Sequence, residues 1–163
     1  MRGRDYMKLE IPAYSHNESF ARVAVGAFLT RLNPTLEELS DVKTAVSEAV
    51  TNAIVHGYSD KPGNPIEISA EVRGSEFVVI VRDFGVGIAD VTQAMEPFYT
   101  SKPDEERSGM GFTVMQTFMD DLQVQSVAGQ GTTVRMVKRL SPGGIGEQYT
   151  PHVAAPLPQE GVQ

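Results

Sequence analysis

The stretch SEAVTNAIVHG, residues 47–57, places the strongest constraint on how this chain can fold. Its polar residues Glu48, Asn52 and His56 are four apart, and small or aliphatic residues separate them. On an α-helix, side chains four apart lie one turn above another, so these three share one stripe. The aliphatic remainder predicts a buried helix, and a polar stripe on a buried helix is costly unless it has partners. We therefore expect the stripe to line a cleft.

Size and charge restrict the class of protein. The 163 residues suit one domain, and the formal net charge is −7. A nucleic-acid binder normally has a basic face, so this balance argues against direct contact with DNA or RNA. The lack of cysteine excludes disulfides and zinc–thiolate sites, and it fits a cytoplasmic protein. The sequence shows neither a membrane-spanning apolar run nor a secretory signal pattern.

Two helices are predicted in the first third of the chain. After a strand over residues 5–11, the segment SHNESFARVAVGAFLTRL has apolar residues at helical spacing. We expect Asn17 to cap this helix and Phe20 to open its core-facing side. The Asn-Pro pair that follows ends it and starts a second helix, from about Thr35 to His56, which contains the polar stripe.

The remaining segments alternate between strands and helices. They comprise a strand hairpin over 65–85, a short helix within 86–98, a long polar loop over 99–111, a helix over 112–122 and a second hairpin around 129–131. This order predicts an α+β fold, a two-layer sandwich of a mixed, mostly antiparallel sheet with helices on one face. We expect residues 1–140 to form one domain and residues 141–163, rich in Pro and Gly, to be a disordered tail.

Three glycine motifs stand at the ends of these elements. Asp83-Phe84-Gly85-Val86-Gly87 follows a strand, where glycines let the backbone approach a flat ligand and an Asp can accept from an exocyclic amine. Gly109-Met110-Gly111-Phe112 opens a helix, whose N-terminal N–H groups favour phosphate. Gly129-Gln130-Gly131-Thr132 joins two strands and offers the Thr132 hydroxyl to a ligand. Taken alone, each motif is equally consistent with an ordinary turn.

The polar stripe and the long loop offer groups for catalysis. The amide oxygen of Asn52 is a hard ligand suited to Mg²⁺, and Glu48, one turn away, can take a proton from a hydroxyl or water. We expect His56 to support the helix end. Lys102 and Arg107 would neutralise a triphosphate if the loop closed over it. The alternative is a solvated helix edge beside a solvated loop.

Taken in order, these motifs resemble the GHKL ATPase superfamily, which includes gyrase, Hsp90, MutL and histidine-kinase catalytic domains. Residues 48–56 match its N box, and the three glycine motifs match its glycine boxes. Within the superfamily, the chain is similar over about residues 7–140 to the anti-sigma serine kinases of Gram-positive bacteria. The segments that carry this similarity are ESFAR, VSEAVTNAIVHGY, VRDFGVGI, FYTSKP and ERSGMGF. Phe84 replaces the expected acidic residue, at a position that contributes mainly backbone.

The resemblance implies a Bergerat ATP-binding fold and a role for each matched residue. Glu48 would be the general base toward a substrate serine, and Asn52 would hold Mg²⁺ between the phosphates of ATP or ADP. The adenine amine would bind Asp83 with help from Thr132. The other implied site residues are Gly85 and Gly87 in the base pocket, Thr100, Ser101 and Lys102 in a lid, Arg107 at the terminal phosphate, Gly109, Gly111 and Phe112 at the phosphates, and Arg22 at a protein-partner surface.

The implied activity is that of a homodimeric, ATP-dependent anti-sigma factor. It would inhibit a sporulation sigma factor and phosphorylate a serine on a STAS-type anti-anti-sigma protein. Alternatives are a general-stress kinase of the same branch, a histidine-kinase-type ATP-binding domain, and an ATP-dependent clamp. A clamp needs a second, transducer domain. His16, in YSHNES, superficially matches a phosphoacceptor box, but the residues after it lack the R-T-P-type helix of such a box. The roughly 30 residues before the ATP-binding helix are also too few for a dimerising helical hairpin.

Overall fold

The computed structural model describes residues 4–96 and 111–142 of the chain. Its elements, in chain order, are β1 (Tyr6–Pro12), α1 (Asn17–Thr30), α2 (Leu36–Asn52), the π-helical turn η1 (Ala53–Gly57), β2 (Pro65–Arg73), β3 (Glu76–Asp83), α3 (Val91–Ala94), α4 (Gly111–Phe118), β4 (Asp121–Val127) and β5 (Gly131–Arg139). The predicted strands and helices are confirmed within these ranges. Most of the expected tail over 141–163 and of the expected loop over 99–111 lies outside the described residues.

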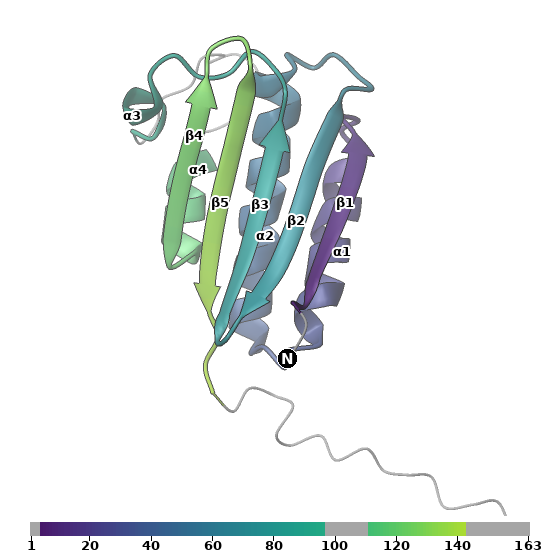
Figure 1. The fold of residues 1–163 in the computed structure, drawn as a ribbon, viewed down its shortest axis with the longest axis vertical. Helices are drawn as coiled ribbons and strands as arrows, with labels where there is room; N and C mark the ends of the chain where they lie inside the picture. The colour runs from purple at the N-terminus through teal and green to yellow at the C-terminus, as the bar shows by residue number, and fades with distance from the viewer. Residues whose placement is uncertain (1–3, 97–110, 143–163) are drawn as a thin grey trace, which may run out of the picture.

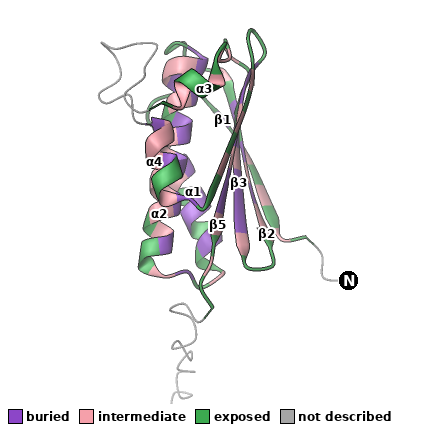
Figure 2. Cartoon of the chain, turned by 90° about the vertical axis from the view of Figure 1, so that its left-hand side faces the viewer, coloured by how far each residue is buried: buried purple, intermediate pink, exposed green. Residues whose placement is uncertain are grey.

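The strands form a five-stranded sheet in the order β1-β2-β3-β5-β4 (Figure 1). The four described strand pairs are all antiparallel, so the parallel pairing that a mixed sheet would include does not occur among them. Figure 2 shows α1, α2 and α4 on one face of the sheet, with the buried residues between the two layers. The predicted two-layer α+β sandwich is therefore confirmed.

Helix α2 is the centre of the helical layer. Its buried side chains include Val42, Ala45, Val46, Ala49 and Val50, which share one core with apolar residues of the sheet and of the helices beside it. This i, i+3, i+4, i+7 spacing is what packs a helix on a sheet. The polar stripe runs beside this apolar face, so the packing of α2 fixes the direction in which the stripe points.

The core-facing side of α1 differs from the predicted one. Phe20 is 52% exposed and Val23 is 58% exposed, so the expectation that Phe20 opens the core face is wrong. The buried residues of α1 are Ala21, Val25, Gly26, Phe28 and Leu29. Apolar residues lie on more than one side of this helix, and periodicity does not decide which side the neighbouring α2 covers.

The helix ends follow local chemistry in one case and not in the other. Thr35 caps α2 with a complete capping box, in which its hydroxyl accepts from the Glu38 N–H and the Glu38 carboxylate accepts from the Thr35 N–H. In α1 the cap position is His16, so the Asn17 prediction is wrong. The Asn17 side-chain amide instead donates to the Pro12 carbonyl at 2.9 Å, which ties the helix to β1.

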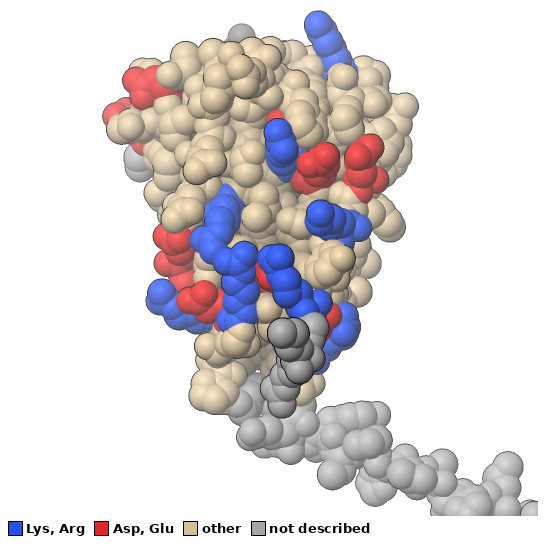
Figure 3. Space-filling view, viewed as in Figure 1, with Lys and Arg blue, Asp and Glu red and all other residues tan. Residues whose placement is uncertain are grey.

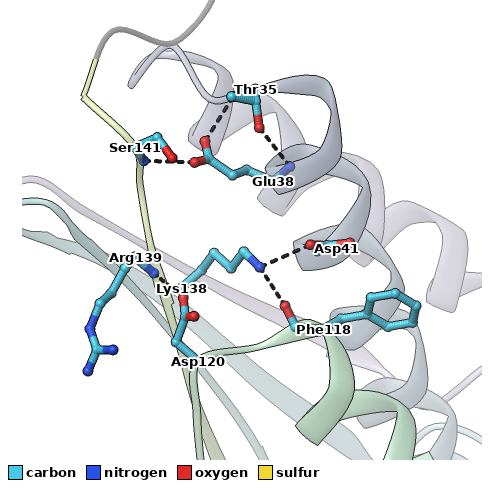
Figure 4. A network of polar contacts seen from close by, with 8 residues as sticks. All are labelled: Thr35, Glu38, Asp41, Phe118, Asp120, Lys138, Arg139 and Ser141. Atoms are coloured by element: carbon cyan, nitrogen blue, oxygen red, sulfur yellow. Dashed lines mark hydrogen bonds and ion pairs between the residues drawn. The ribbon is translucent and has the colours of Figure 1, made fainter.

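A buried carboxylate joins the start of α2 to the end of β5 (Figure 4). Glu38 is 7% exposed, and its second oxygen accepts from the Ser141 N–H at 2.7 Å. Close by, the Lys138 ammonium donates to Asp41 at 3.0 Å and to the Phe118 carbonyl at 2.7 Å. Burial alone would raise the pKa of the Glu38 carboxyl, but the N–H donors of Ser141 and Thr35 outweigh burial and lower it.

The face of the sheet opposite the helices is open and carries charges of both signs (Figure 3). Two of its arginines are paired with acids, Arg73 with Glu71 at 3.1 Å and Arg135 with Asp121 at 3.8 Å. Exposed pairs of this kind contribute little to stability. Among the described residues, the helices are too short or too polar to cross a membrane.

We predict that Glu38→Ala lowers the free energy of unfolding by about 1.5–3 kcal/mol, because the part-buried N–H donors of Thr35 and Ser141 lose a charged acceptor. Glu37→Ala, which changes an exposed acid in the same helical turn, is the control and should cost less than about 1 kcal/mol through the helix dipole. Chemical denaturation measures both variants. Equal losses for Glu37 and Glu38 would contradict an anchoring role for Glu38.

The same carboxylate has a defined pH signature. Because folding lowers its pKa below the ordinary 4.5, its contribution is present above that pH and is lost as the pH falls through the folded value. The parent should therefore lose stability on acidification more steeply than Glu38→Ala does.

Candidate functional site

Two residues of the polar stripe, Asn52 and His56, line a cavity of about 350 Å³ at one end of the sandwich, whereas Glu48 does not. Its walls come from the end of α2, from η1, from the turn after β3, and from the starts of α4 and β5. Among the predicted site residues, those that line the cavity are Asn52, Asp83, Gly87, Gly111, Phe112 and Thr132, and His56 lines it as well. Segments far apart in the sequence thus line one cavity, which none of the motifs taken alone could predict.

Asp83 is the buried acid of the cavity. It ends β3, is 5% exposed and faces Thr132 across the β3–β5 ladder. Burial raises the pKa of its carboxyl, and N–H groups of Gly85 and Thr132 offset part of that rise. The Gly85 N–H donates to Asp83 Oδ1 at 2.9 Å. A buried carboxylate on a cavity wall is suited to accept further hydrogen bonds from a bound donor.

Two glycines allow the turn after β3 to approach its neighbours. A side-chain carbon on Gly85 would lie 1.8 Å from the Gly57 carbonyl oxygen, closer than any real contact. Gly87 has a positive φ of +71°, and a side-chain carbon there would lie 2.2 Å from the Val127 carbonyl oxygen. Backbone bonds fix the same approach, since Val86 N–H donates to the Gly57 carbonyl at 2.9 Å. The glycines of this motif are therefore explained by close packing of backbone on backbone.

Ser126 supports Thr132 and was not found from the sequence. Its hydroxyl lies 2.8 Å from the Thr132 hydroxyl and donates to the Gly131 carbonyl at 3.0 Å. It also accepts from the Ile88 N–H at 2.7 Å, which ties the β3 turn to the last hairpin. A serine at an inward position of an edge strand gives no distinctive signal in one sequence, because only the fold brings its partners together.

Helix α4 begins against the polar stripe. A side-chain carbon on Gly111 would lie 3.0 Å from both the oxygen and the nitrogen of the Asn52 amide, so the first residue of α4 lies directly on Asn52. The N–H groups of a helix start favour anions. An amide oxygen suited to a hard cation therefore lies beside backbone donors suited to phosphate.

Glu48 lines a second hollow. This groove, of about 310 Å³, lies between α1 and α2 and also includes Arg22, Lys43 and Ser47. Glu18 accepts from the Ser47 hydroxyl and lies 3.5 Å from Arg22 Nε. Within the described residues, that nitrogen has no hydrogen-bond partner. The structure thus places Glu48 and Arg22 together, one turn of α2 before Asn52.

Five predicted site residues lie outside the described ranges. They are Thr100, Ser101, Lys102, Arg107 and Gly109. For them the assignments remain predictions from the resemblance.

The groups that line the cavity suit a purine nucleotide with a bound metal ion. A buried acceptor and close-packed glycines line one part of the cavity, and an amide beside a helix start lines another. Fold and site thus define an ATP-binding domain of the GHKL class. The sequence profile described as "Histidine kinase-like ATPase domain" matches residues 11–138.

Comparison with known proteins narrows the class. The chain is 58% identical over 134 residues to the "Anti-sigma F factor" of Clostridium novyi (strain NT), covering 82% of this chain and 94% of that protein. It is 59% identical over 132 residues to the "Anti-sigma F factor" of Clostridium kluyveri (strain NBRC 12016), covering 81% and 92%. The chain belongs to the anti-sigma F factor family, which confirms the resemblance described above.

A solved structure shares the fold. The crystal structure of the RsbU and RsbW domains of a Mycobacterium tuberculosis protein aligns with a TM-score of 0.61 at 18% identity, covering 83% of this chain and 32% of that one. At this identity the likeness concerns the fold alone.

We predict that Gly85→Ala weakens nucleotide binding at least tenfold and costs about 1–3 kcal/mol of stability, as overpacking does. The added methyl cannot coexist with the Gly57 carbonyl. Gly74→Asn is the control, because that hairpin glycine has open space around it and asparagine tolerates its φ of +60°. Calorimetric titration and thermal denaturation measure both, and unchanged binding by Gly85→Ala would contradict the packing argument.

Proposed function

We propose that the chain is an ATP-dependent anti-sigma factor of sporulation that binds a sigma factor and phosphorylates a serine on the factor's anti-anti-sigma antagonist. The observation that carries this proposal is the cavity in which Asn52, Asp83 and the start of α4 meet, in a chain of the anti-sigma F factor family. The name of the relatives supports the proposed binding of a sigma factor, and the residues of the cavity support the proposed binding of a nucleotide.

In the proposal, Asp83 recognises the adenine base. Its carboxylate accepts a hydrogen bond from the exocyclic amine, and Thr132 assists from the paired strand. Gly87 would form part of the wall of the base pocket, and Gly85 would allow the same turn to pack on the Gly57 carbonyl, because side chains at either position would collide with neighbouring backbone.

Asn52 would hold Mg²⁺ beside the phosphates, and the ion would neutralise charge on the transferred group. Gly111 and Phe112 would present backbone N–H groups to the same phosphates. Thr100, Ser101, Lys102, Arg107 and Gly109 complete the phosphate site by resemblance. Among the described residues, no cluster of three or more His, Cys, Asp or Glu side chains could hold a metal. The Asn52 amide oxygen would therefore be this chain's ligand to the ion.

Glu48 would act as the general base. As the serine oxygen bonds to the terminal phosphorus of ATP, the Glu48 carboxylate takes the hydroxyl proton and ADP leaves. Because Glu48 lines the groove between α1 and α2 and not the cavity with Asp83, an acceptor segment would approach the phosphates from that groove.

Helix α1 would supply a protein-partner surface. Arg22 borders the same groove, and the exposed Phe20 and Val23 lie on the same helix. On the strength of the resemblance, we assign Arg22 and the exposed Phe20 and Val23 to contacts with protein partners. The homodimer remains part of the proposal on the strength of the resemblance.

The histidine-kinase alternative fits this architecture less well. The residues before α2 form a strand and one helix, and the ring of His16 stacks on Tyr14 at 5.4 Å in the connection between them. A phosphoacceptor histidine would need a helical dimerisation hairpin. The general-stress kinase of the same branch stays open as the second candidate.

The test uses the purified chain, Mg·ATP and a STAS-type anti-anti-sigma protein from the same genome. Intact-mass spectrometry should show one added phosphate on that partner, mapped to serine. If ATP binds and no partner mass changes, the kinase half of the proposal is wrong and a nucleotide-gated binding protein remains.

We predict that Glu48→Gln retains Mg·ATP binding within about twofold but lowers phosphotransfer by about 10²–10⁴-fold, the usual contribution of a general base. Single-turnover kinetics and equilibrium binding separate the two effects. Glu37→Gln, on the exposed start of the same helix, is the matched control. Unchanged turnover in Glu48→Gln would remove the base role.

We predict that Asp83→Asn weakens ATP binding by about 1.5–3 kcal/mol, since a charge-assisted hydrogen bond to the base is lost. Asp60→Asn is the control, because Asp60 is exposed and its φ of +58° suits asparagine. Titration calorimetry measures both variants, and an affinity within twofold of the parent would exclude Asp83 from the base pocket.

A further inference from the structure

We propose that Tyr58 is a positioning residue for base recognition, which holds the turn that aims the Asp83 carboxylate into the cavity. The inference rests on the proposed role of Asp83. It adds a residue that lies outside the cavity wall and that the motif comparison did not assign.

The Tyr58 hydroxyl replaces the next rung of the β2–β3 ladder. The last pair in that ladder is Ile66 with Asp83, so Pro65 and Phe84 stand opposite each other one step further on. Proline has no N–H to donate, so the only bond left for this rung is one from the Phe84 N–H to the Pro65 carbonyl. The Tyr58 hydroxyl instead accepts from the Phe84 N–H at 2.8 Å and donates to the Pro65 carbonyl at 2.5 Å.

Three consecutive amides of the turn are thereby assigned. The Phe84 N–H donates to the Tyr58 hydroxyl, the Gly85 N–H to the Asp83 carboxylate, and the Val86 N–H to the Gly57 carbonyl. The central bond orients the carboxylate, and Gly57 and Tyr58 hold the amides on either side of it. The direction of Asp83 therefore depends on its own turn and on these two neighbours.

The π-helical turn brings both neighbours to the correct side. The Tyr58 N–H bonds to the Ala53 carbonyl, five residues back, at 2.9 Å. Gly57 then lies so close to Asp83 that a side-chain carbon on it would be 2.7 Å from the carboxyl carbon. Tyr58 itself is 7% exposed, and burial raises the pKa of its phenol. The hydroxyl stays protonated at neutral pH and can serve as both donor and acceptor.

The test compares Mg·ATP with Mg·ITP, because inosine carries a carbonyl oxygen where adenine carries the amine. Tyr58→Phe keeps the ring and removes the hydroxyl. We expect its ATP affinity to fall about five- to tenfold, the factor expected for one lost hydrogen bond, with ITP affinity changed less than about twofold. The ATP-to-ITP ratio therefore falls, which a general loss of stability would not cause.

Two further variants separate the possible outcomes. Thr35→Val removes the cap at the far end of α2, so it should lower the melting temperature and leave the ratio unchanged. In the Asp83→Asn background, Tyr58→Phe should have less effect on ATP affinity than in the parent. Full additivity of the two changes, or an unaltered ratio in Tyr58→Phe alone, would overturn the positioning role while Asp83 keeps its own. If neither Asp83→Asn nor the change of base alters affinity, the base-recognition proposal itself is wrong, and the Tyr58 inference with it.

Hydrogen exchange gives a measurement that needs no ligand. The Phe84 amide should exchange slowly in the parent and much faster in Tyr58→Phe, with core amides of β3 unaffected. Rapid exchange of Phe84 in the parent would contradict the hydrogen bond on which the inference depends.

Discussion

The contact between the end of α2 and the turn after β3 determines the geometry of the site. Backbone meets backbone there, with Gly85 against the Gly57 carbonyl and a hydrogen bond from Val86 closing the contact. Because the apolar side of α2 is fixed on the sheet, its polar stripe and this turn cannot move independently. Asn52 on the helix and Asp83 on the strand consequently face one cavity from different elements. This arrangement suits a nucleotide, whose base and phosphates need different binding groups.

Much of the fold could be predicted from local patterns. Alternation identified the strands, the Asn-Pro pair identified the start of α2, and the glycines identified the turns. The failures occurred where more than one local choice was satisfactory. Helix α1 has apolar residues on more than one side, and the side that packs is decided by α2 and the sheet, which leaves Phe20 in solvent. Asn17 has the chemistry of a cap but donates to the Pro12 carbonyl instead.

The motif residues of the candidate site could be predicted from the sequence, but the residues that hold them in place could not. Asn52, Asp83 and Thr132 belong to patterns with a recognisable order, and the structure brings them together. Tyr58 and Ser126 act through hydrogen bonds to residues 26 and 38 positions away in the chain, and no periodicity reports such distances. The sequence also could not predict that Glu48 lines the groove with Arg22, because this depends on how α1 and α2 are placed relative to each other.

The most direct test of this account is a crystal structure of the protein with Mg²⁺ and a non-hydrolysable ATP analogue. The account predicts the adenine amine within hydrogen-bond distance of Asp83, the metal on the Asn52 amide oxygen, and the terminal phosphate on the side from which Glu48 approaches. A base bound away from Asp83, or phosphates remote from Asn52, would contradict the claim that one cavity holds the nucleotide at both ends.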